Sequence, residues 1–527
     1  MRFIGIIGMI TMVGIAFLFS NNKKFIRPRI VIWGLGLQFL FAMIILSESI
    51  LSWIGMFIFA FIILLYIFED KVLAGSGWQK EALISIVILI LATLATIALY
   101  FLDRVGITSY LFSAVLIVYL ILLFMKYPRY PRYLFSVLML SGLSMLIQRG
   151  IYGKDVFAQV ATKVDKFLKL TDLGTTFLFG NLAKPEYFDK FGFQFAFSVL
   201  PTIIFFSAFM SILYYLGIMQ VLVQVMAKFM RWTMGTSGAE TLSCSANIFV
   251  GQTEAPLLIR PFLEEMTPSE LHAIMVGGFA TIAGGVLAGY IRMGVNPGHL
   301  IAASVMSAPA ALVMAKLFFP ETEHSKTAGD VEIPDVGRAD NLLDAAARGV
   351  TDGLKLAVNV GAMLVAFIAL IGFVDAIFGY FDKLVDFRLL GGTFNAAKGE
   401  YSGIFPGSLK TLFGTIFSPL AFLMGVPWKD AVEVGNLLGI KIAVNEFVAY
   451  SELALHIQAA DLSARAITIS TYALCGFANF ASIGIQIGGI SALAPSRRSD
   501  LSRFAMRAMF AGALASWMTA TIAGILV

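Results

Sequence analysis

The residues of this sequence best suited to chemistry are polar groups inside strongly apolar segments. The stretch SCSANIFVGQTEAPLLIRPFL, Ser243 to Leu263, carries Gln252, Thr253 and Glu254 side by side. A second stretch, GIKIAVNEFVAYSEL, Gly439 to Leu453, carries Asn445 and Glu446. An acidic side chain at the centre of a membrane helix costs about 2.5 to 3.5 kcal/mol on insertion scales. If these segments enter a membrane, both glutamates therefore need a function or a partner.

Three kinds of role are open to these carboxylates. Gln252 and Thr253 add hydrogen-bond donors and acceptors beside Glu254, and this grouping suits recognition of a heterocyclic base. Alternatively, Glu254 could cap the second helix of its segment or pair with Arg260. Two converging carboxylates could also serve an intramembrane hydrolase. Because no Ser-His pair or metal-ligand cluster accompanies them, the sequence favours contact with a solute over catalysis.

Two glycine-rich segments follow these stretches along the chain. One begins GFATIAGGVLAGY at Gly278, and the other begins GFANFASIGIQIGG at Gly476. Small residues permit close helix packing, but a glycine-rich span can also unwind and expose carbonyl groups to a cation. Asn479 and Ser482 are polar positions in the second segment, and Phe477 offers a flat face for a ring. We expect this cluster to contact a ligand.

The backbone of the first stretch cannot be one straight helix. Gly251, Pro256 and Pro261 lie in its middle, and proline interrupts a helix. Irregular backbone is tolerated at membrane depth only where it is buried in protein or lines a wet cavity. The sequence therefore predicts a hairpin that enters and leaves on one side, with its break at residues 251 to 254.

Composition places these segments in a membrane. Of 527 residues, 59% are hydrophobic and 13% charged, and the mean hydropathy is +0.86. Apolar runs such as Glu81 to Leu102, Ile107 to Met125 and Phe504 to Val527 reach the roughly 20 residues that span a bilayer as a helix. They lack the alternation of strands. The sequence predicts an all-α polytopic membrane protein in which Met1 to Ser20 is a retained first span.

Charge and cysteine usage exclude other classes. The formal net charge is +5, but the basic residues gather in short loops between spans, which predicts orientation in the membrane and not nucleic-acid binding. The loops at 23–29, 126–132, 228–231 and 497–503 should face the cytoplasm. The two cysteines and four scattered histidines form neither a disulfide framework nor metal-ligand spacing.

The predicted spans divide the chain into five parts. We expect an N-terminal pair of spans (1–50), an additional four-span insertion (51–150), an amphipathic interfacial helix and linker (151–185), a first core repeat with one hairpin (186–340) and a second core repeat with the other hairpin and a C-terminal span (341–527). The predicted insertion spans are Leu51 to Phe68, Ala82 to Phe101, Thr108 to Met125 and Tyr133 to Ile147. The amphipathic helix covers Lys154 to Leu170. The hydrophilic connection between the repeats is Pro320 to Asp340.

The two halves of the core repeat one order of features. Each has a broken apolar segment with a glutamate, followed by a glycine-rich span. The intervening segments, Leu300 to Phe319 and Leu354 to Phe378, bring the second half in from the opposite side of the membrane. Such an inverted repeat is typical of secondary transporters, and catalysis does not require it.

These motifs together resemble the concentrative nucleoside transporter family. GQTEAPLLIRPFL and NEFVAY look like the two hairpin motifs of that family. GFATIAGGVLAGY and GFANFASIGIQIGG look like its two partly unwound spans. The resemblance covers about Thr171 to Val527, together with an opening pair of spans, whereas the extra spans between Leu51 and Ile147 depart from the compact bacterial pattern.

The resemblance implies a role for individual residues. Gln252, Thr253 and Glu254 would bind the nucleobase, with Val286 lining the pocket. Glu446, Asn479 and Ser482 would hold the ribose, with Phe477 packed beside the ligand. Gly251 would set selectivity, because it leaves room beside the base that a serine would fill. Sodium would be held by the side chains of Asn247 and Thr281 and the carbonyls of Val250 and Ile282.

The resemblance also implies how the protein works. We expect sodium-coupled import of nucleosides such as uridine, cytidine or adenosine by a homotrimer, through an elevator-type alternating-access mechanism in the inner membrane of a bacterium. Sodium would be the coupling ion, membrane lipid would surround the trimer, and no organic cofactor is expected. Some relatives use protons, so a proton-coupled symporter is the alternative, and an intramembrane carboxylate enzyme is the alternative of a different class.

Overall fold

The computed structural model describes residues 2–68, 130–187, 190, 194–329, 331, 339–396 and 399–527. Contacts divide the chain into two compact units, one of residues 1–38 and 161–527 and the other of residues 39–160. Within the described residues, seven helices are long and apolar enough to span a membrane, or up to nine if each of two bent pairs is one span. The all-α prediction is confirmed, since the described strands are limited to the two-residue pair β1 (Phe394–Asn395) and β2 (Glu400–Tyr401).

The smaller unit is built from predicted spans. It contains the end of α2 (Pro28–Leu46), α3 (Ile50–Phe68), α6 (Tyr130–Gln148) and the start of α7 (Gly153–Leu168). Ser52 of α3 connects α2 to α7, because its hydroxyl donates to Ile44 O (3.0 Å) and accepts from Gly153 N (2.9 Å). The spans predicted at 51–68 and 133–147 are confirmed as helices, as is the amphipathic helix, whereas those predicted at 82–101 and 108–125 lie outside the described residues.

The larger unit contains two runs of helices in the same order. Each run has a long helix, a helix beside it, a broken pair, a second broken pair and a final long helix. The first run is α11 (Leu200–Tyr215), α12 (Ile218–Met234), α13 (Gly238–Ala246) with the 3-10 helix η5 (Ala255–Glu265), α14 (Pro268–Ala280) with α15 (Gly284–Arg292), and α16 (Pro297–Phe318). The second is α17 (Leu342–Asp382), α18 (Leu409–Leu423), α19 (Trp428–Ala443) with α20 (Glu446–Ala459), α21 (Ala464–Leu474) with α22 (Phe480–Leu493), and α23 (Arg498–Leu526).

Shorter elements complete the described chain. They are α1 (Arg2–Leu18), η1 (Lys23–Phe25), α8 (Thr171–Phe179), η3 (Gly180–Ala183), η4 (Pro185–Tyr187), α10 (Phe195–Ser198), the π-helical η6 (Lys383–Leu389) and η7 (Pro495–Arg497). The last long helix, α23, packs against α1, α14, α16 and α21. The core of the larger unit therefore forms around a helix that is buried along most of its length.

Hairpin 1, formed by α13 and η5, breaks earlier than predicted. The helix ends at Ala246, so the non-helical segment is 247–254 and not 251–254. The reason is tertiary, because carbonyls that would continue the helix have other donors: Ser304 Oγ donates to Ile248 O (3.1 Å) and Gly284 N donates to Phe249 O (3.1 Å). After the break, Pro256 and Pro261 hold the chain as a 3-10 helix.

Hairpin 2, formed by α19 and α20, has a shorter break at Val444 and Asn445. The side chain of Asn445 caps α20 by accepting from Val448 N at 2.9 Å. The buried Lys441 fixes the other helix of the hairpin, since its ammonium donates to Ala473 O (2.8 Å) and Ser516 Oγ (2.7 Å). Helix α20, which begins at Glu446, packs against α19 and α21.

Both glycine-rich spans unwind where the sequence indicates. The first is non-helical between α14 and α15, at residues 281–283, and the second between α21 and α22, at residues 475–479. The two breaks contact each other, because Phe477 N donates to Thr281 O at 3.1 Å. A Cβ at Gly476, which has a φ of 157°, would lie 2.8 Å from Phe279 O. Glycine permits this close crossing.

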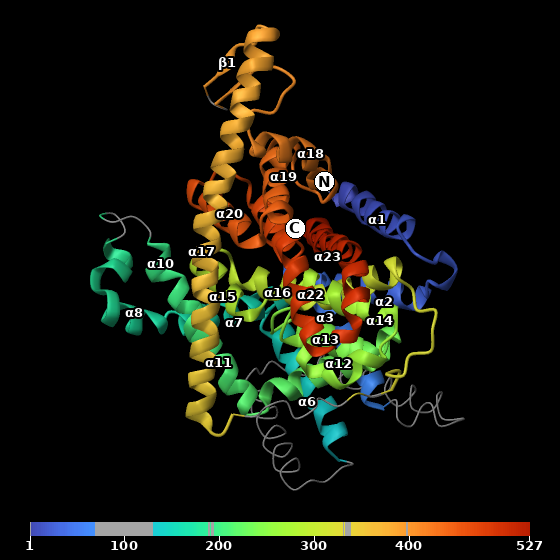
Figure 1. Ribbon diagram of the computed structural model, residues 1–527. Coiled ribbons are helices and arrows are strands. Elements are labelled where there is room, and N and C mark those ends of the chain that lie inside the picture. Colours follow the sequence, from blue (N-terminus) through green and yellow to red (C-terminus); the bar gives the residue numbers. More distant parts are fainter. Residues whose placement is uncertain are drawn as a thin grey trace. The chain divides into compact units, whose positions relative to one another are not determined.

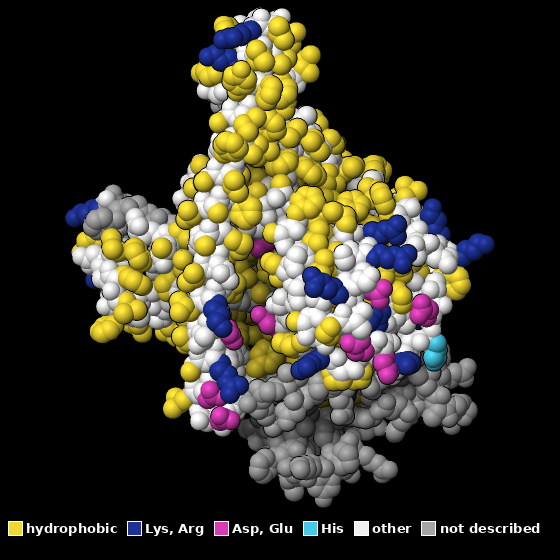
Figure 2. Space-filling view, viewed as in Figure 1, with side chains coloured by type: hydrophobic (Ala, Val, Ile, Leu, Met, Phe, Trp, Pro, Cys, Tyr) yellow, Lys and Arg dark blue, Asp and Glu magenta, His cyan; other side chains and the backbone are white. Residues whose placement is uncertain are grey.

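Helix α17 is one continuous helix along the larger unit (Figure 1). Its 41 residues correspond to about 60 Å, and it is uncharged from Leu356 to Val374, a length close to the hydrocarbon thickness of a bilayer. Figure 2 shows hydrophobic side chains along the middle of α17 and charged side chains near its ends. Val365 and Phe373 are 76% and 64% exposed, which fits contact with lipid or with another chain.

Candidate substrate and ion site

The residues predicted to contact a base lie at the tip of hairpin 1, against α22. Gln252 Nε2 donates to Ser482 Oγ at 3.2 Å, and Gln252 Oε1 accepts from Gln486 Nε2 at 3.0 Å. A Cβ at Gly489 would lie 2.8 Å from Thr253 Cγ2, so Thr253 also faces α22. The first broken segment of the chain is therefore seated on a helix more than two hundred residues away in the sequence.

Glu254 closes the turn of hairpin 1. Its carboxylate accepts from Gly251 N, and it makes no side-chain cap on η5. Among the ion pairs of the described residues, none joins Glu254 to Arg260. The alternative that Glu254 caps the second helix of the hairpin or pairs with Arg260 is therefore wrong. Its carboxylate orders the turn itself and keeps further acceptor capacity for a ligand.

The residues predicted to hold a ribose surround Glu446. One carboxylate oxygen accepts from Tyr290 OH at 3.3 Å, and the other accepts from Asn479 Nδ2 at 3.0 Å. Asn479 also caps α22, because its Oδ1 accepts from Ser482 N at 2.8 Å. Glu446 is 5% exposed. The structure thus brings together all three residues that the family resemblance assigns to the ribose.

The base set and the ribose set form one polar network. Ser482 belongs to both, since its hydroxyl contacts Gln252 while its backbone is held by Asn479. In the described part of the chain, no lysine or arginine forms an ion pair with Glu446. A buried carboxylate held only by neutral donors retains acceptor sites for ligand hydroxyl groups.

Two predicted residues that lie nearby have apolar side chains. Val286 is buried in the first turn of α15, directly after the first break. Phe477 lies in the second break, where its backbone contacts Thr281. Their packing against a ligand stays a prediction.

The two side chains predicted to hold sodium, Asn247 and Thr281, both lie beside Gly277. Asn247 is buried, and neither polar atom of its side chain has a hydrogen-bond partner among the described residues. Its Nδ2 would lie 3.3 Å from a Cβ at Gly277. The Thr281 hydroxyl donates to Gly277 O at 2.9 Å, which leaves its lone pairs available.

The two carbonyl groups of this predicted site are also available. Within the described residues, neither Val250 O nor Ile282 O accepts a backbone hydrogen bond outside regular helices, and both residues lie in the breaks. Unwound backbone carbonyls beside polar side chains are a cation site of secondary transporters. The donor set fits sodium, and which ion binds stays a prediction.

Two residues of the network were missed by sequence reasoning. Tyr290 stands in the GGVLAGY motif, and its hydroxyl contacts Glu446. Gln486 is the single polar residue in the apolar run IGIQIGG and is fully buried. Its burial cost in a membrane was the one available signal, because its partners, Gln252 and Met275, are distant in sequence.

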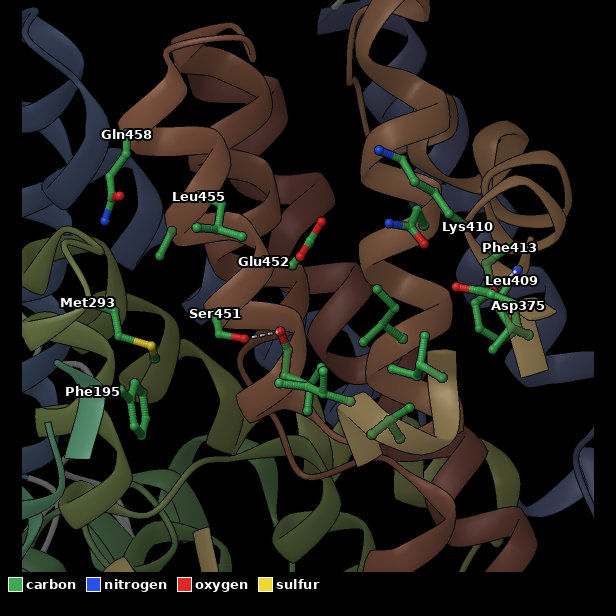
Figure 3. Close-up of a pocket in the computed structure, with 17 residues that line it drawn as sticks. Phe195, Met293, Asp375, Leu409, Lys410, Phe413, Ser451, Glu452, Leu455 and Gln458 are labelled. Carbon is green, nitrogen blue, oxygen red and sulfur yellow. Dashed lines mark hydrogen bonds between the residues drawn. The ribbon is translucent and has the colours of Figure 1, made fainter. Parts of the chain in front are cut away.

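A cavity of about 500 Å³ lies beside hairpin 2. Ser451, Leu455 and Gln458 of α20 line one wall, and Asp375 and Lys410 lie on the opposite side (Figure 3). Val444 and Val448 also line it, so the cavity reaches the hairpin tip that carries Glu446.

Known families match nearly the whole core. The family described as "Na+ dependent nucleoside transporter C-terminus" matches residues 299–524, and its N-terminal counterpart matches residues 7–66. The family described as "Nucleoside recognition" matches residues 196–296. A rat protein named sodium/nucleoside cotransporter 1 is 44% identical over 398 residues, which are 73% of this chain and 58% of that protein. Solved structures of the transporter CNTnw are 33% identical and cover 98% of its chain. The chain belongs to the concentrative nucleoside transporter family.

Further comparisons show how much of the chain is similar to other proteins of known sequence or structure. A protein of Haemophilus influenzae named only as an uncharacterized transporter is 46% identical over 390 residues, covering 73% of this chain and 89% of that protein. The inward-facing, substrate-bound structure of CNTnw has a TM-score of 0.72 and covers 100% of this chain, as does an outward-facing variant at 32% identity. The chain is a membrane transporter of the Na+-dependent nucleoside family, which excludes the enzyme alternative.

Proposed function

We propose that this protein imports nucleosides together with sodium across the inner membrane of a bacterium. The observation that carries the proposal is the continuous network from Gln252 through Ser482 and Asn479 to Glu446. It combines an amide for a base with a carboxylate for ribose hydroxyl groups. Uridine, cytidine and adenosine all present these two chemistries.

The place of the candidate ion site supports the proposal of sodium coupling. Asn247 and Val250 lie in the break of hairpin 1, directly before Gln252, and Thr281 and Ile282 lie in the break that contacts Phe477. An ion bound there would order both segments that a nucleoside contacts. Each ligand would then favour binding of the other, which is what coupling requires.

The ion supplies the driving force for uphill import. A nucleoside is neutral, so accumulation must draw on an ion gradient, worth about 2.3 kcal/mol per charge per 100 mV in addition to the concentration term. The proposed mechanism is an elevator in which hairpins and broken spans move together within a homotrimer. The outward- and inward-facing structures of CNTnw support alternating access, and the cavity between α17 and α20 leaves space beside hairpin 2.

Binding to the purified protein tests this proposal without transport. We expect uridine to bind at least about tenfold more tightly in sodium than in choline, because the two ligands order shared segments. Isothermal titration of the detergent-solubilised protein measures both affinities. Equal affinity in sodium and choline would show that the ion and the nucleoside are not coupled through this site.

Replacement of Gly251 by serine should change the purine-to-pyrimidine ratio of uptake. A Cβ at Gly251 would lie 2.6 Å from Glu254 Oε2 and 3.5 Å from Ala283 Cβ, so the serine must displace the carboxylate or occupy space beside the base. Competition of adenosine and uridine for uptake of labelled uridine measures the ratio. An unaltered ratio in a Gly251→Ser protein that still transports would remove Gly251 from the selectivity site.

A further inference from the structure

Gln486 holds Gln252 in one orientation. The Nε2 of Gln486 donates to Met275 O at 3.1 Å and to Gln252 Oε1 at 3.0 Å. A backbone carbonyl can only accept, so the group of Gln486 that faces Met275 must be its NH2. The same NH2 faces Gln252, and Gln252 must therefore present its oxygen there. Its own NH2 is left to face Ser482.

Ser482 cannot fix this orientation by itself. A hydroxyl group both donates and accepts, so it bonds equally to the oxygen or to the NH2 of an amide. Of the two side chains that hydrogen-bond Gln252 in the described residues, only Gln486 distinguishes one end of the amide from the other. Gln486 thus decides which end faces which partner.

The two glutamines can contact each other only because the neighbouring residue, Gly278, has no side chain. A Cβ at Gly278 would lie 2.6 Å from Gln486 Nε2 and 2.9 Å from Gln252 Cβ, so a glycine is needed for them to meet. Gln486 is fully buried, and its Oε1 has no hydrogen-bond partner in the described part of the chain. The contact is kept although it leaves a buried acceptor unsatisfied.

We propose that Gln486 is a positioning residue that sets nucleobase selectivity by fixing the donor and acceptor ends of the Gln252 amide. The inference rests on the proposed function, in which Gln252 contacts the base. Once Gln486 and Ser482 are bonded, Gln252 has one N–H and one oxygen lone pair left for a ligand. Uracil and cytosine present a donor and an acceptor at positions 3 and 4 in opposite order. One orientation of Gln252 matches one base, and the reverse orientation matches the other.

A Gln486→Glu variant should reverse the amide. An ionised carboxylate only accepts, so Gln252 must turn its NH2 toward position 486. A protonated carboxyl that donates to Met275 O has the same effect. Gln486→Met keeps the side-chain length and removes both hydrogen bonds, which frees Gln252 to adopt either orientation. Gly278→Ala separates the two glutamines from the other side of the contact.

The experiment measures kcat/KM for uridine and cytidine with the full chain in proteoliposomes, together with the ratio of uridine to 2′-deoxyuridine as a ribose control. We expect the uridine-to-cytidine ratio to change by about tenfold in Gln486→Glu and to move toward one in Gln486→Met and Gly278→Ala, with the ribose ratio unchanged. Equal loss for all nucleosides in the transporting variants would overturn the role of Gln486. A wild-type protein that transports neither nucleoside would refute the proposed function instead.

Discussion

Replacing Glu446 with glutamine is expected to reduce uridine kcat/KM by about 100-fold or more. Glutamine keeps the shape of the side chain, but it removes the charge and half of the acceptor capacity. Hydrogen bonds from ribose hydroxyl groups to a charged acceptor contribute about 1.5 to 3 kcal/mol each, and two of them account for the loss. The amide also cannot accept from Tyr290 and Asn479 on both sides, as the carboxylate does. Uptake into proteoliposomes measures the effect.

Glu452 provides the matched control on the same helix. It lines the cavity from α20 and lies six residues after Glu446, so Glu452→Gln should leave uridine uptake essentially unchanged. The elution volume of each purified variant checks that assembly is normal. Wild-type uptake by a well-assembled Glu446→Gln protein would remove Glu446 from the ribose site.

Replacing Asn247 with leucine, or Thr281 with valine, is expected to raise the sodium concentration for half-maximal uptake by about tenfold or more. Each change removes one side-chain oxygen from the candidate ion site and keeps a similar shape. The carbonyls of Val250 and Ile282 remain, so sodium binding should weaken without being lost. Uptake of labelled uridine measured across a range of sodium concentrations gives the value.

Thr468 offers a close match for the Thr281 substitution. Its hydroxyl donates to the carbonyl four residues earlier, Ala464 O, at 2.9 Å, as the Thr281 hydroxyl does to Gly277 O. Thr468 lies on an exposed part of α21, away from both breaks. Thr468→Val should therefore leave the sodium dependence unchanged. A wild-type sodium dependence in both site variants would place the ion elsewhere.

The breaks in the helices were predictable because their signals are local. Glycine and proline in hairpin 1 and glycine in the paired spans weaken a helix through the chemistry of their own backbone. The early end of α13 was not predictable, since Ser304 and Gly284 supply the hydrogen bonds that replace those of the helix. No pattern within residues 243–250 contains that information.

The members of the polar network were predictable only in part, for a related reason. Glu446 and Gln252 stand out as costly groups in apolar segments, and the motif resemblance adds Asn479 and Ser482. Gln486 gains its role from a partner 234 residues away and from the absence of a side chain at Gly278. Spacing along one helix cannot show such a contact, whereas the packing of hairpin 1 against α22 shows it directly.

Uptake of labelled uridine into liposomes that hold the purified protein tests the central claim most directly. An inward sodium gradient is compared with a choline control and with an inward proton gradient in the absence of sodium. Sodium-coupled import predicts accumulation of uridine above its external concentration only in the sodium gradient. Equal uptake in choline, or accumulation driven by protons alone, would contradict sodium coupling, and failure under all three conditions would contradict uridine as a substrate.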